Sequence, residues 1–252
     1  HLPPDPTMHI RLINPNTSAA MTASIGAAAQ RIAAPATRLT AVNPADGPES
    51  IESHFDDAIA AVGVCEEILR GERDGVDAYI IACFGDPGLN AARELTRAPV
   101  IGIAQAAFHM ASLVSTRFSV VTTLRRTVIL AEHLLSQYGC ATLCASVRAT
   151  DIPVLELEHN PSACAAQLID QAQHARDHDG AGAIVLGCGG MAGFAADMQA
   201  ALGIPVIDGV SAAVKLAEAA VGLGLHTSKH GDLATPLPKS FTGRFAHFSR
   251  SA

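Results

Sequence analysis

The sequence has 252 residues, of which 49% are hydrophobic and 16% are charged. Globular proteins average about 25% charged residues, so this composition indicates a chain with a large buried core and excludes a disordered one. The 17 basic and 24 acidic residues give a net charge of −7 with no stripe of Lys or Arg, which argues against nucleic acid as a partner.

Short apolar runs alternate with segments of helical periodicity. Strands are predicted in the first half at residues 10–13, 39–42, 78–82 and 100–103, and helices at 18–34 and 53–71. The expected core-facing residues of the second helix are Phe55, Ala58, Ile59, Val62, Cys65 and Leu69. Strands are predicted in the second half at 118–121, 143–147, 183–186 and 206–207, and helices at 124–138 and 162–178. Apolar strands that alternate with helices predict an α/β fold with parallel sheets.

The two halves resemble each other. Residues 98–107 (APVIGIAQAA) match 204–213 (IPVIDGVSAA) at an offset of 106, and Cys83 matches Cys188 at an offset of 105. We therefore expect two pseudo-symmetric lobes, each with a mainly parallel sheet of about four strands. The first lobe is predicted to comprise residues 8–104 plus 210–252, and the second residues 105–209. The binding cleft is expected where the carboxyl ends of the two sets of strands face each other.

Cys83 and Cys188 share one local design, in which an apolar strand leads into a cysteine and then into glycine-rich chain. Phe84 and Gly85 follow Cys83, and Gly189 and Gly190 follow Cys188. Glycine lets the backbone approach a ligand, and a nearby helix N-terminus favours thiolate, which predicts a lowered pKa for both thiols. One such cysteine is more often a buried strand end, but two at equivalent positions favour a functional pair. The other cysteines are expected to be core residues: Cys65, Cys140, Cys144 and Cys164.

Short polar side chains follow the matching strand ends. The first half carries Asn14, Asn16, Thr17 and Ser18 there, and the second half carries Thr122 and Thr123. Such residues either cap the next helix or bind a ligand. Two adjacent hydroxyls at the end of a buried strand favour the second interpretation for the threonine pair. Ile51, at the end of GPESI, is either another wall of the pocket or part of a simple turn.

Cofactor and targeting signals are weak. Six cysteines without a CxxC pair predict reduced thiols and no structural zinc. His174 and His178 are spaced for a metal, but their charged neighbours favour a solvated helix face. The GCGGMAG segment lacks the Lys-Ser/Thr of a phosphate-binding loop. No apolar run reaches the roughly 18–20 residues of a membrane span, and no signal-peptide layout is present, so we expect no membrane partner and a cytoplasmic protein. Residues 1–7 precede Met8, the expected natural start, and are expected to lie outside the fold.

At these motifs the sequence resembles the aspartate/glutamate racemase superfamily, and within it the branch of hydantoin and allantoin racemases. The resemblance runs from Ile10 to about Gly231 and rests on INPNTS, GPESIE, IACFGDPGLNAARE, PVIGIAQAA, RFSVVTTLRRT, IVLGCGGMA, PVIDGVSAAVKLAE and TSKHGD. The segments FGDPGL, HMA with TRFSVVTT, and GCGGMA most resemble the allantoin racemases. Hydantoin racemases for amino-acid-derived substrates often carry an acid where Gly85 stands.

The resemblance implies a cofactor-independent racemase with two cysteine bases, acting on a small neutral hydantoin ring in purine degradation. One thiolate would remove the proton at C5 of allantoin, and the opposite thiol would return one to the other face. N–H groups near Gly85, Gly189 and Gly190 and the hydroxyls of Thr122 and Thr123 would bind the ring carbonyls. The remaining substrate-binding candidates are Asn16, Ser18, Ile51 and Phe84. The family also implies a homo-oligomer.

Three alternatives stay open from the sequence. The substrate could be another 5-substituted hydantoin. An amino-acid racemase or a maleate-isomerase-like enzyme would act on carboxylates and would need fixed cations, whereas Arg125, Arg126 and Lys215 are expected on helix surfaces. A two-lobed small-molecule binding protein would carry out no reaction, and such proteins are normally exported.

Overall fold

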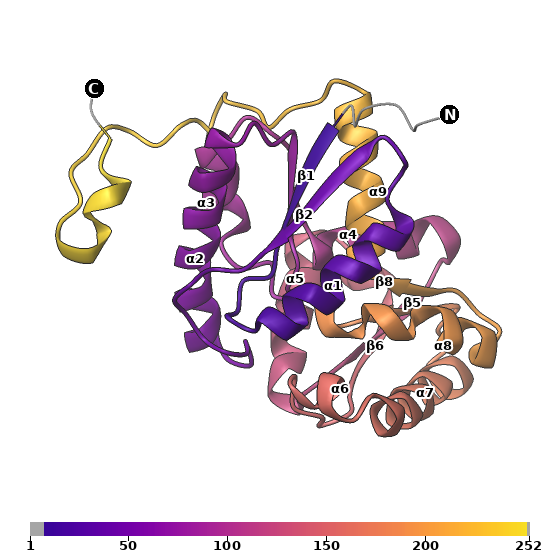
Figure 1. Ribbon diagram of the computed structural model, residues 1–252. Coiled ribbons are helices and arrows are strands. Elements are labelled where there is room, and N and C mark those ends of the chain that lie inside the picture. Colours follow the sequence, from indigo (N-terminus) through magenta and orange to yellow (C-terminus); the bar gives the residue numbers. More distant parts are fainter. Residues whose placement is uncertain (1–7, 251–252) are drawn as a thin grey trace.

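The structure, a computed structural model, describes residues 8–250 and contains two four-stranded parallel sheets (Figure 1). The first sheet has the order β2-β1-β3-β4, with β1 (Met8–Ile13), β2 (Thr37–Val42), β3 (Ala78–Ile81) and β4 (Val100–Gly102). The second has the order β6-β5-β7-β8, with β5 (Phe118–Thr122), β6 (Cys144–Ala149), β7 (Ala183–Leu186) and β8 (Val206–Asp208). The α/β fold with two parallel sheets is therefore confirmed. The expectation for residues 1–7 lies outside the described residues.

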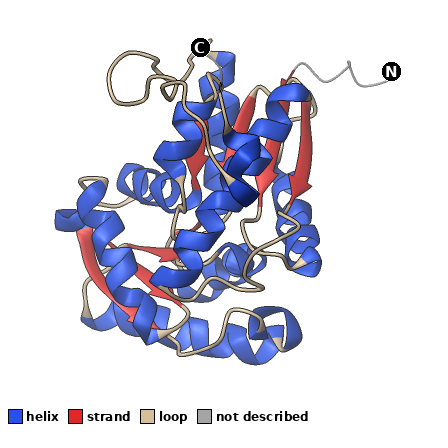
Figure 2. Ribbon diagram, turned by 90° about the vertical axis from the view of Figure 1, so that its left-hand side faces the viewer, coloured by secondary structure: helices blue, strands red, loops and turns tan. Residues whose placement is uncertain are grey.

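The burial of the inner strands explains why the apolar runs in the sequence predicted strands correctly. Every residue of β3 (AYII) and of β7 (AIVL) is buried, because helices cover both faces of each sheet. Figure 2 shows the two sheets as separate groups of strands with helices packed around them. A strand that is covered on both sides reads as a continuous apolar run. The identical strand order in the two sheets matches the repeat in the sequence.

The helices follow the strands in regular alternation. The α-helices are α1 (Ala19–Ile32), α2 (His54–Arg73), α3 (Leu89–Leu95), α4 (Ile103–Val114), α5 (Val128–Gln137), α6 (Glu156–His159), α7 (Pro161–His178), α8 (Ala195–Leu202) and α9 (Gly209–Gly222). Short 3₁₀ helices lie at η1 (Arg125–Thr127), η2 (Ala141–Leu143), η3 (Gly189–Phe194) and η4 (Gly243–Phe248). Within residues 8–250, every helix is too short or too polar to cross a membrane.

Helices α4 and α9 are exchanged between the two sheets. Although α4 directly follows β4 of the first sheet, it packs against β7 of the second. Helix α9 follows β8 but packs against β1, β3 and β4, and in Figure 1 it lies beside the strands of the first sheet. The two helices also pack against each other, where Gly209 leaves room for the carbonyl oxygen of Ile103. One buried cluster therefore spans both sheets and includes Ile80, Phe108 and Val185.

The prediction of helix α2 was correct, but the prediction of its buried face was wrong. Phe55 is 75% exposed and Ile59 is 39% exposed, whereas Val64 and Ile68 are fully buried. The buried face also contains glycines, and a Cβ on Gly63 would lie 2.8 Å from side-chain carbons of Pro44. Glycines that allow such close packing add no hydrophobicity to a helical pattern, so the pattern favoured the wrong face.

The chain after α9 returns to the first lobe. The Thr227 hydroxyl donates to the carbonyl oxygen of Ala98 at 2.7 Å. The Lys229 ammonium donates to the carbonyl oxygens of Glu94 (3.0 Å) and Leu233 (3.2 Å). The TSKHGD motif thus attaches this segment to the C-terminal end of α3, where a cation is favourable beside unpaired carbonyls. Its role is structural.

Candidate active site

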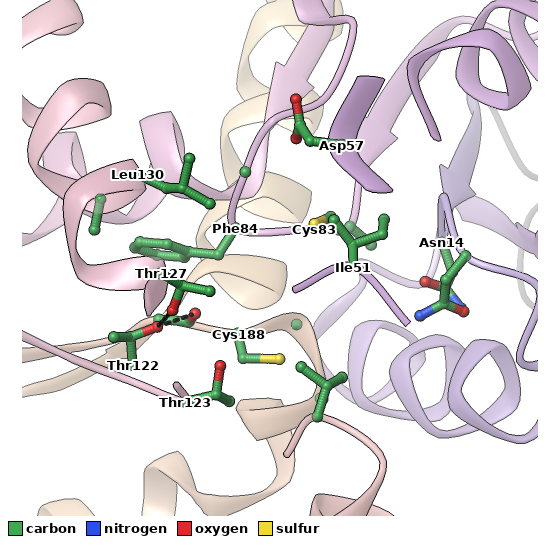
Figure 3. Close-up of a pocket in the computed structure, with 18 of the residues that line it drawn as sticks. Asn14, Ile51, Asp57, Cys83, Phe84, Thr122, Thr123, Thr127, Leu130 and Cys188 are labelled. Carbon is green, nitrogen blue, oxygen red and sulfur yellow. Dashed lines mark hydrogen bonds between the residues drawn. The ribbon is translucent and has the colours of Figure 1, made fainter. Parts of the chain in front are cut away.

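A pocket lies where the carboxyl ends of strands from both sheets meet (Figure 3). Asn14 follows β1, Cys83 follows β3, Thr123 follows β5 and Cys188 follows β7. The residues that line the pocket are Asn14, Asn16, Met21, Ile51, Asp57, Ala82, Cys83, Phe84, Gly85, Thr122, Thr123, Thr127, Leu130, Ala131, Val154, Gly187, Cys188, Gly189 and Gly190. Residues of both sheets are thus brought to one site, as parallel strands permit at this edge.

The two cysteines occupy equivalent positions in this pocket. Figure 3 shows both side chains directed into the space between the two loops. A Cβ added to Gly85 would lie 3.8 Å from the Cys83 sulfur, and a Cβ added to Gly190 would lie 3.8 Å from the Cys188 sulfur. In each loop the backbone N–H of that glycine interacts favourably with the thiolate form of the cysteine two residues before it. The repeat in the sequence therefore extends to the surroundings of each sulfur.

Glycines also allow the two loops to touch. A Cβ on Gly189 would come 2.5 Å from the carbonyl oxygen of Ala82, the residue before Cys83. A Cβ on Gly187 would come 2.8 Å from the Cβ atom of Thr122, at the end of β5. Since contacts this close exclude any side chain, Gly189 sets how near the loop of Cys188 lies to the loop of Cys83, and Gly187 sets how near it lies to β5.

The expected lowering of the cysteine pKa values is wrong. Burial raises the pKa of Cys188 to about 11, and the N–H of Gly190 offsets this only in part. Burial also raises the pKa of Cys83, and the nearby Cys188, Asp57 and Asp86 raise it further. The local N–H groups act in the predicted direction, but removal of the sulfur from water has the larger effect. Both cysteines are therefore held as thiols at neutral pH.

The two threonines at the end of β5 have different roles. The Thr122 hydroxyl is 3.2 Å from that of Thr127 and can donate to the carbonyl oxygen of Gly187 at 3.3 Å. It therefore supports the loop of Cys188. The Thr123 hydroxyl has no hydrogen-bond partner among residues 8–250 and lies beside Cys188 in Figure 3. It is the hydroxyl that is free to bind a ligand.

The asparagines are held by one another, and Ser18 lies outside the pocket. The side-chain amide of Asn14 donates to Asn16 Oδ1 at 2.7 Å and to Thr22 Oγ1 at 3.0 Å. Asn16 Oδ1 also accepts from the backbone N–H of Ser18. The Ser18 hydroxyl accepts from the N–H of Met21 and so caps α1, which is a structural role and not the substrate contact expected from the sequence.

The remaining substrate-binding candidates border the pocket: Asn16, Ile51, Phe84, Gly85, Gly189 and Gly190. Thr17 does not, because its hydroxyl donates to the carbonyl oxygen of Pro48 at 3.3 Å. Sequence reasoning missed Asp57, which comes from the first turn of α2, and the apolar side chains of Met21, Leu130 and Val154. No local motif marks these residues, since each enters the pocket from a separate segment. A Cβ at Gly85 would lie 2.7 Å from Asp57 Oδ1. The glycine at position 85 was therefore the one indirect sign in the sequence that another group lies close to this loop.

A buried carboxylate supports the loop of Cys83 from behind. Asp86 accepts hydrogen bonds from the backbone N–H groups of Ala104 and Gln105, both at 3.0 Å, and from the Tyr138 hydroxyl at 2.8 Å. Asp86 adopts a φ of 46°, which is unusual for a residue with a side chain. Its three partners hold this conformation and tie the cysteine loop to the N-terminus of α4.

Two histidines on α7 do not extend the site. The ring centroids of His174 and His178 are 4.4 Å apart, and neither residue borders the pocket. Within residues 8–250 no group of three or more His, Cys, Asp or Glu side chains is placed to hold a metal ion.

Comparison with known proteins identifies the family. The sequence profile of the Asp/Glu/hydantoin racemase family matches residues 10–217. The chain belongs to this family. Its members include a hydantoin racemase from Rhizobium meliloti that is 50% identical over 236 residues, covering 94% of this chain and 98% of the relative. The expected family is thereby confirmed, and the chain is an isomerase of the racemase type.

Two solved structures of family members have the same fold. An allantoin racemase from Klebsiella pneumoniae is 57% identical, with a TM-score of 0.95 over 96% of this chain and 99% of the other. An allantoin racemase from Pseudomonas fluorescens is 42% identical, with a TM-score of 0.91 over 94% of this chain and 100% of the other. This Asp/Glu/hydantoin racemase therefore shares its whole architecture with both.

Proposed function

We propose that this racemase interconverts (R)- and (S)-allantoin by proton transfer between Cys83, Cys188 and C5 of the hydantoin ring. The observation that carries the proposal is the equivalent placement of the two sulfurs, each 3.8 Å from the Cβ position of the glycine two residues on, in one pocket. Inversion needs one acid/base group on each face of the reacting carbon, and two repeated loops supply such a pair.

The reaction balances with these two groups alone. The thiolate of one cysteine takes the proton from C5, and the electron pair of the C–H bond moves into the adjacent C4 carbonyl to give an enolate. The thiol of the other cysteine then gives its proton to C5 from the opposite face and becomes a thiolate. The product enantiomer leaves an enzyme with reversed protonation, which is the form that acts in the other direction.

The pocket offers hydrogen-bond donors for the enolate. We assign this role to the hydroxyl of Thr123 and to backbone N–H groups of the two glycine-rich loops. One such donor, aimed at developing charge in a site shielded from water, contributes about 3–4 kcal/mol to transition-state stabilisation. Asn14 and Asn16 present amide groups from the first lobe and are candidates for a ring carbonyl or N–H.

The charge of the pocket favours a neutral substrate. Among the described residues that line it, Asp57 is the one ionisable side chain besides the two thiols, and its charge is negative. A carboxylate substrate would be repelled by Asp57, whereas a neutral hydantoin would not. This argues against the amino-acid racemase and maleate-isomerase-like alternatives.

The choice of allantoin over other hydantoins rests on similarity and on the FGDPGL and GCGGMA segments. The allantoin racemase from K. pneumoniae is 57% identical to this chain, and the hydantoin racemase from R. meliloti is 50% identical. Racemisation of other 5-substituted hydantoins therefore stays the second candidate. Allantoin as substrate would place the enzyme in purine degradation.

We also propose that the chain acts as a homo-oligomer. Several large apolar side chains are well exposed in the single chain, among them Phe55 (75%) and Leu113 (76%). Contact with another subunit would remove such side chains from water. Light scattering coupled to gel filtration would give the mass in solution, and a mass of about 26 kDa would contradict this proposal.

Polarimetry on a single enantiomer of allantoin, with chelator and without added cofactor, tests the function. The wild type should bring the optical rotation to zero, and Cys83→Ser and Cys188→Ser should each abolish this. Each variant should still exchange the C5 hydrogen of one enantiomer for deuterium, because one base is left. Cys65→Ser, on α2 outside the pocket, is the matched control and should keep full activity. Full racemisation by either catalytic variant would overturn the two-cysteine mechanism.

A further inference from the structure

Asp57 is a carboxylate in the pocket that the proton-transfer mechanism does not use. It belongs to the first turn of α2, where its backbone N–H donates to the carbonyl oxygen of the capping residue Ser53 at 3.0 Å. Within residues 8–250 no donor is hydrogen-bonded to its side chain, and Figure 3 shows the carboxylate at the edge of the pocket. Its neighbour Asp56 differs, since its carboxylate accepts from the N–H of Glu52 at 3.0 Å and lies outside the pocket.

The position of Asp57 relative to the reacting groups follows from Gly85. The point where a Cβ on Gly85 would lie is 2.7 Å from Asp57 Oδ1 and 3.8 Å from the Cys83 sulfur. Glycine at 85 thus lets the Asp57 carboxylate lie against the loop of Cys83, close to the thiol. A substrate whose C5 lies at Cys83 would therefore have the Asp57 carboxylate close to its C5 substituent.

Burial takes part of the hydration from the Asp57 carboxylate, and the nearby His54 offsets this only in part. The charge of Asp57 raises the pKa of the neighbouring Cys83 thiol and so opposes formation of the thiolate that the reaction needs. Burial in turn raises the pKa of Asp57 itself. A substrate with N–H donors on its substituent would offset the cost of burying this carboxylate, since a carboxylate accepts up to two such bonds from a urea.

We propose that Asp57 accepts hydrogen bonds from the N–H groups of the ureido substituent at C5 and thereby selects ureido-hydantoins over alkyl- and arylalkyl-hydantoins. This inference rests on the proposed two-cysteine reaction and names the substrate class for it. The apolar neighbours Ile51, Leu130 and Val154 would accommodate an alkyl chain equally well. The Asp57 carboxylate then discriminates between the two substrate classes, because an alkyl substituent would bury the carboxylate without giving it a hydrogen-bond donor.

The test compares allantoin with 5-isobutylhydantoin, whose substituent has the same number of non-hydrogen atoms as the ureido group but no N–H. We expect the wild type to prefer allantoin in kcat/KM. Asp57→Leu, which removes the acceptor, should lower the allantoin to isobutylhydantoin ratio by about 10- to 100-fold. Asp57→Asn, which keeps one acceptor oxygen, should lower it less. Asp56→Asn makes the same charge change one residue away and should leave the ratio unchanged.

The outcomes separate this inference from the function on which it rests. If the Asp57 variants change kcat/KM for both substrates by the same factor, Asp57 acts only through the Cys83 thiol or through folding, and the inference is overturned. A wild type that racemises isobutylhydantoin but not allantoin overturns the choice of substrate as well. Loss of both activities in Cys83→Ser, with the ratio unchanged in the Asp57 variants, supports the mechanism and contradicts the selectivity.

Discussion

Gly189 and Ala82 are in backbone contact across the active site, so close that a Cβ on Gly189 would lie 2.5 Å from the Ala82 carbonyl oxygen. Gly189→Ala should therefore push apart the loops that carry Cys83 and Cys188. We expect kcat/KM to fall at least 100-fold, because misplacement of a catalytic group by about 1 Å has effects of this size. The free energy of unfolding should fall by about 1–3 kcal/mol.

Gly193 provides the matched control for this substitution. It lies in the same 3₁₀ helix, η3, and a Cβ there would have no atom within 4 Å. Gly193→Ala should keep both activity and stability close to those of the wild type. Equal losses in the two variants, measured by racemisation assay and urea denaturation, would show that the contact with Ala82 is unimportant.

The two threonines at the end of β5 should respond differently to loss of their hydroxyls. Thr123→Val should lower kcat about 100-fold or more without changing the melting temperature, because this hydroxyl is assigned to the enolate and has no partner in the described protein. Thr122→Val should lower the melting temperature, because it breaks the hydrogen bond to Gly187. Thermal unfolding and initial rates distinguish the two. A normal kcat in Thr123→Val would remove this residue from the mechanism.

Activity should increase with pH across the neutral and mildly alkaline range. The reaction needs one thiolate, and burial raises the pKa of Cys188 to about 11 and that of Cys83 as well. The thiolate fraction therefore grows about tenfold for each pH unit below these values, and kcat/KM should follow it with a slope close to one between pH 7 and 9. The rate of uncatalysed racemisation must be subtracted at each pH. A plateau below pH 8 would mean that the thiol which reacts has a much lower pKa.

The fold was predictable because its signal is local and repeated. The runs that became β3 and β7 are apolar throughout, and the glycines after Cys83 and Cys188 mark the same turn twice. Most pocket residues named from the sequence lie within a few positions of these strand ends. The carboxyl ends of parallel strands lie at the same edge of a sheet, so recognising the strands is enough to predict that these positions lie close together.

Features that depend on tertiary contacts were not predictable in the same way. Asp57 reaches the pocket because α2 packs on the first sheet, and nothing in its sequence neighbourhood marks this. The buried face of α2 was predicted wrongly, since close packing at Gly63 depends on where Pro44 lies. The pKa of each thiol was predicted in the wrong direction, because the cost of burial outweighs the favourable N–H groups.

The exchanged helices α4 and α9 have a consequence for synthesis of the chain. As the protein emerges from the ribosome, the first sheet is finished by residue 102, but the helix that covers one of its faces ends at Gly222. Neither half can complete its own core from its own residues. The two repeated halves therefore cannot fold independently of each other. A fragment that ends between the lobes would expose an apolar face of the first sheet and would tend to aggregate.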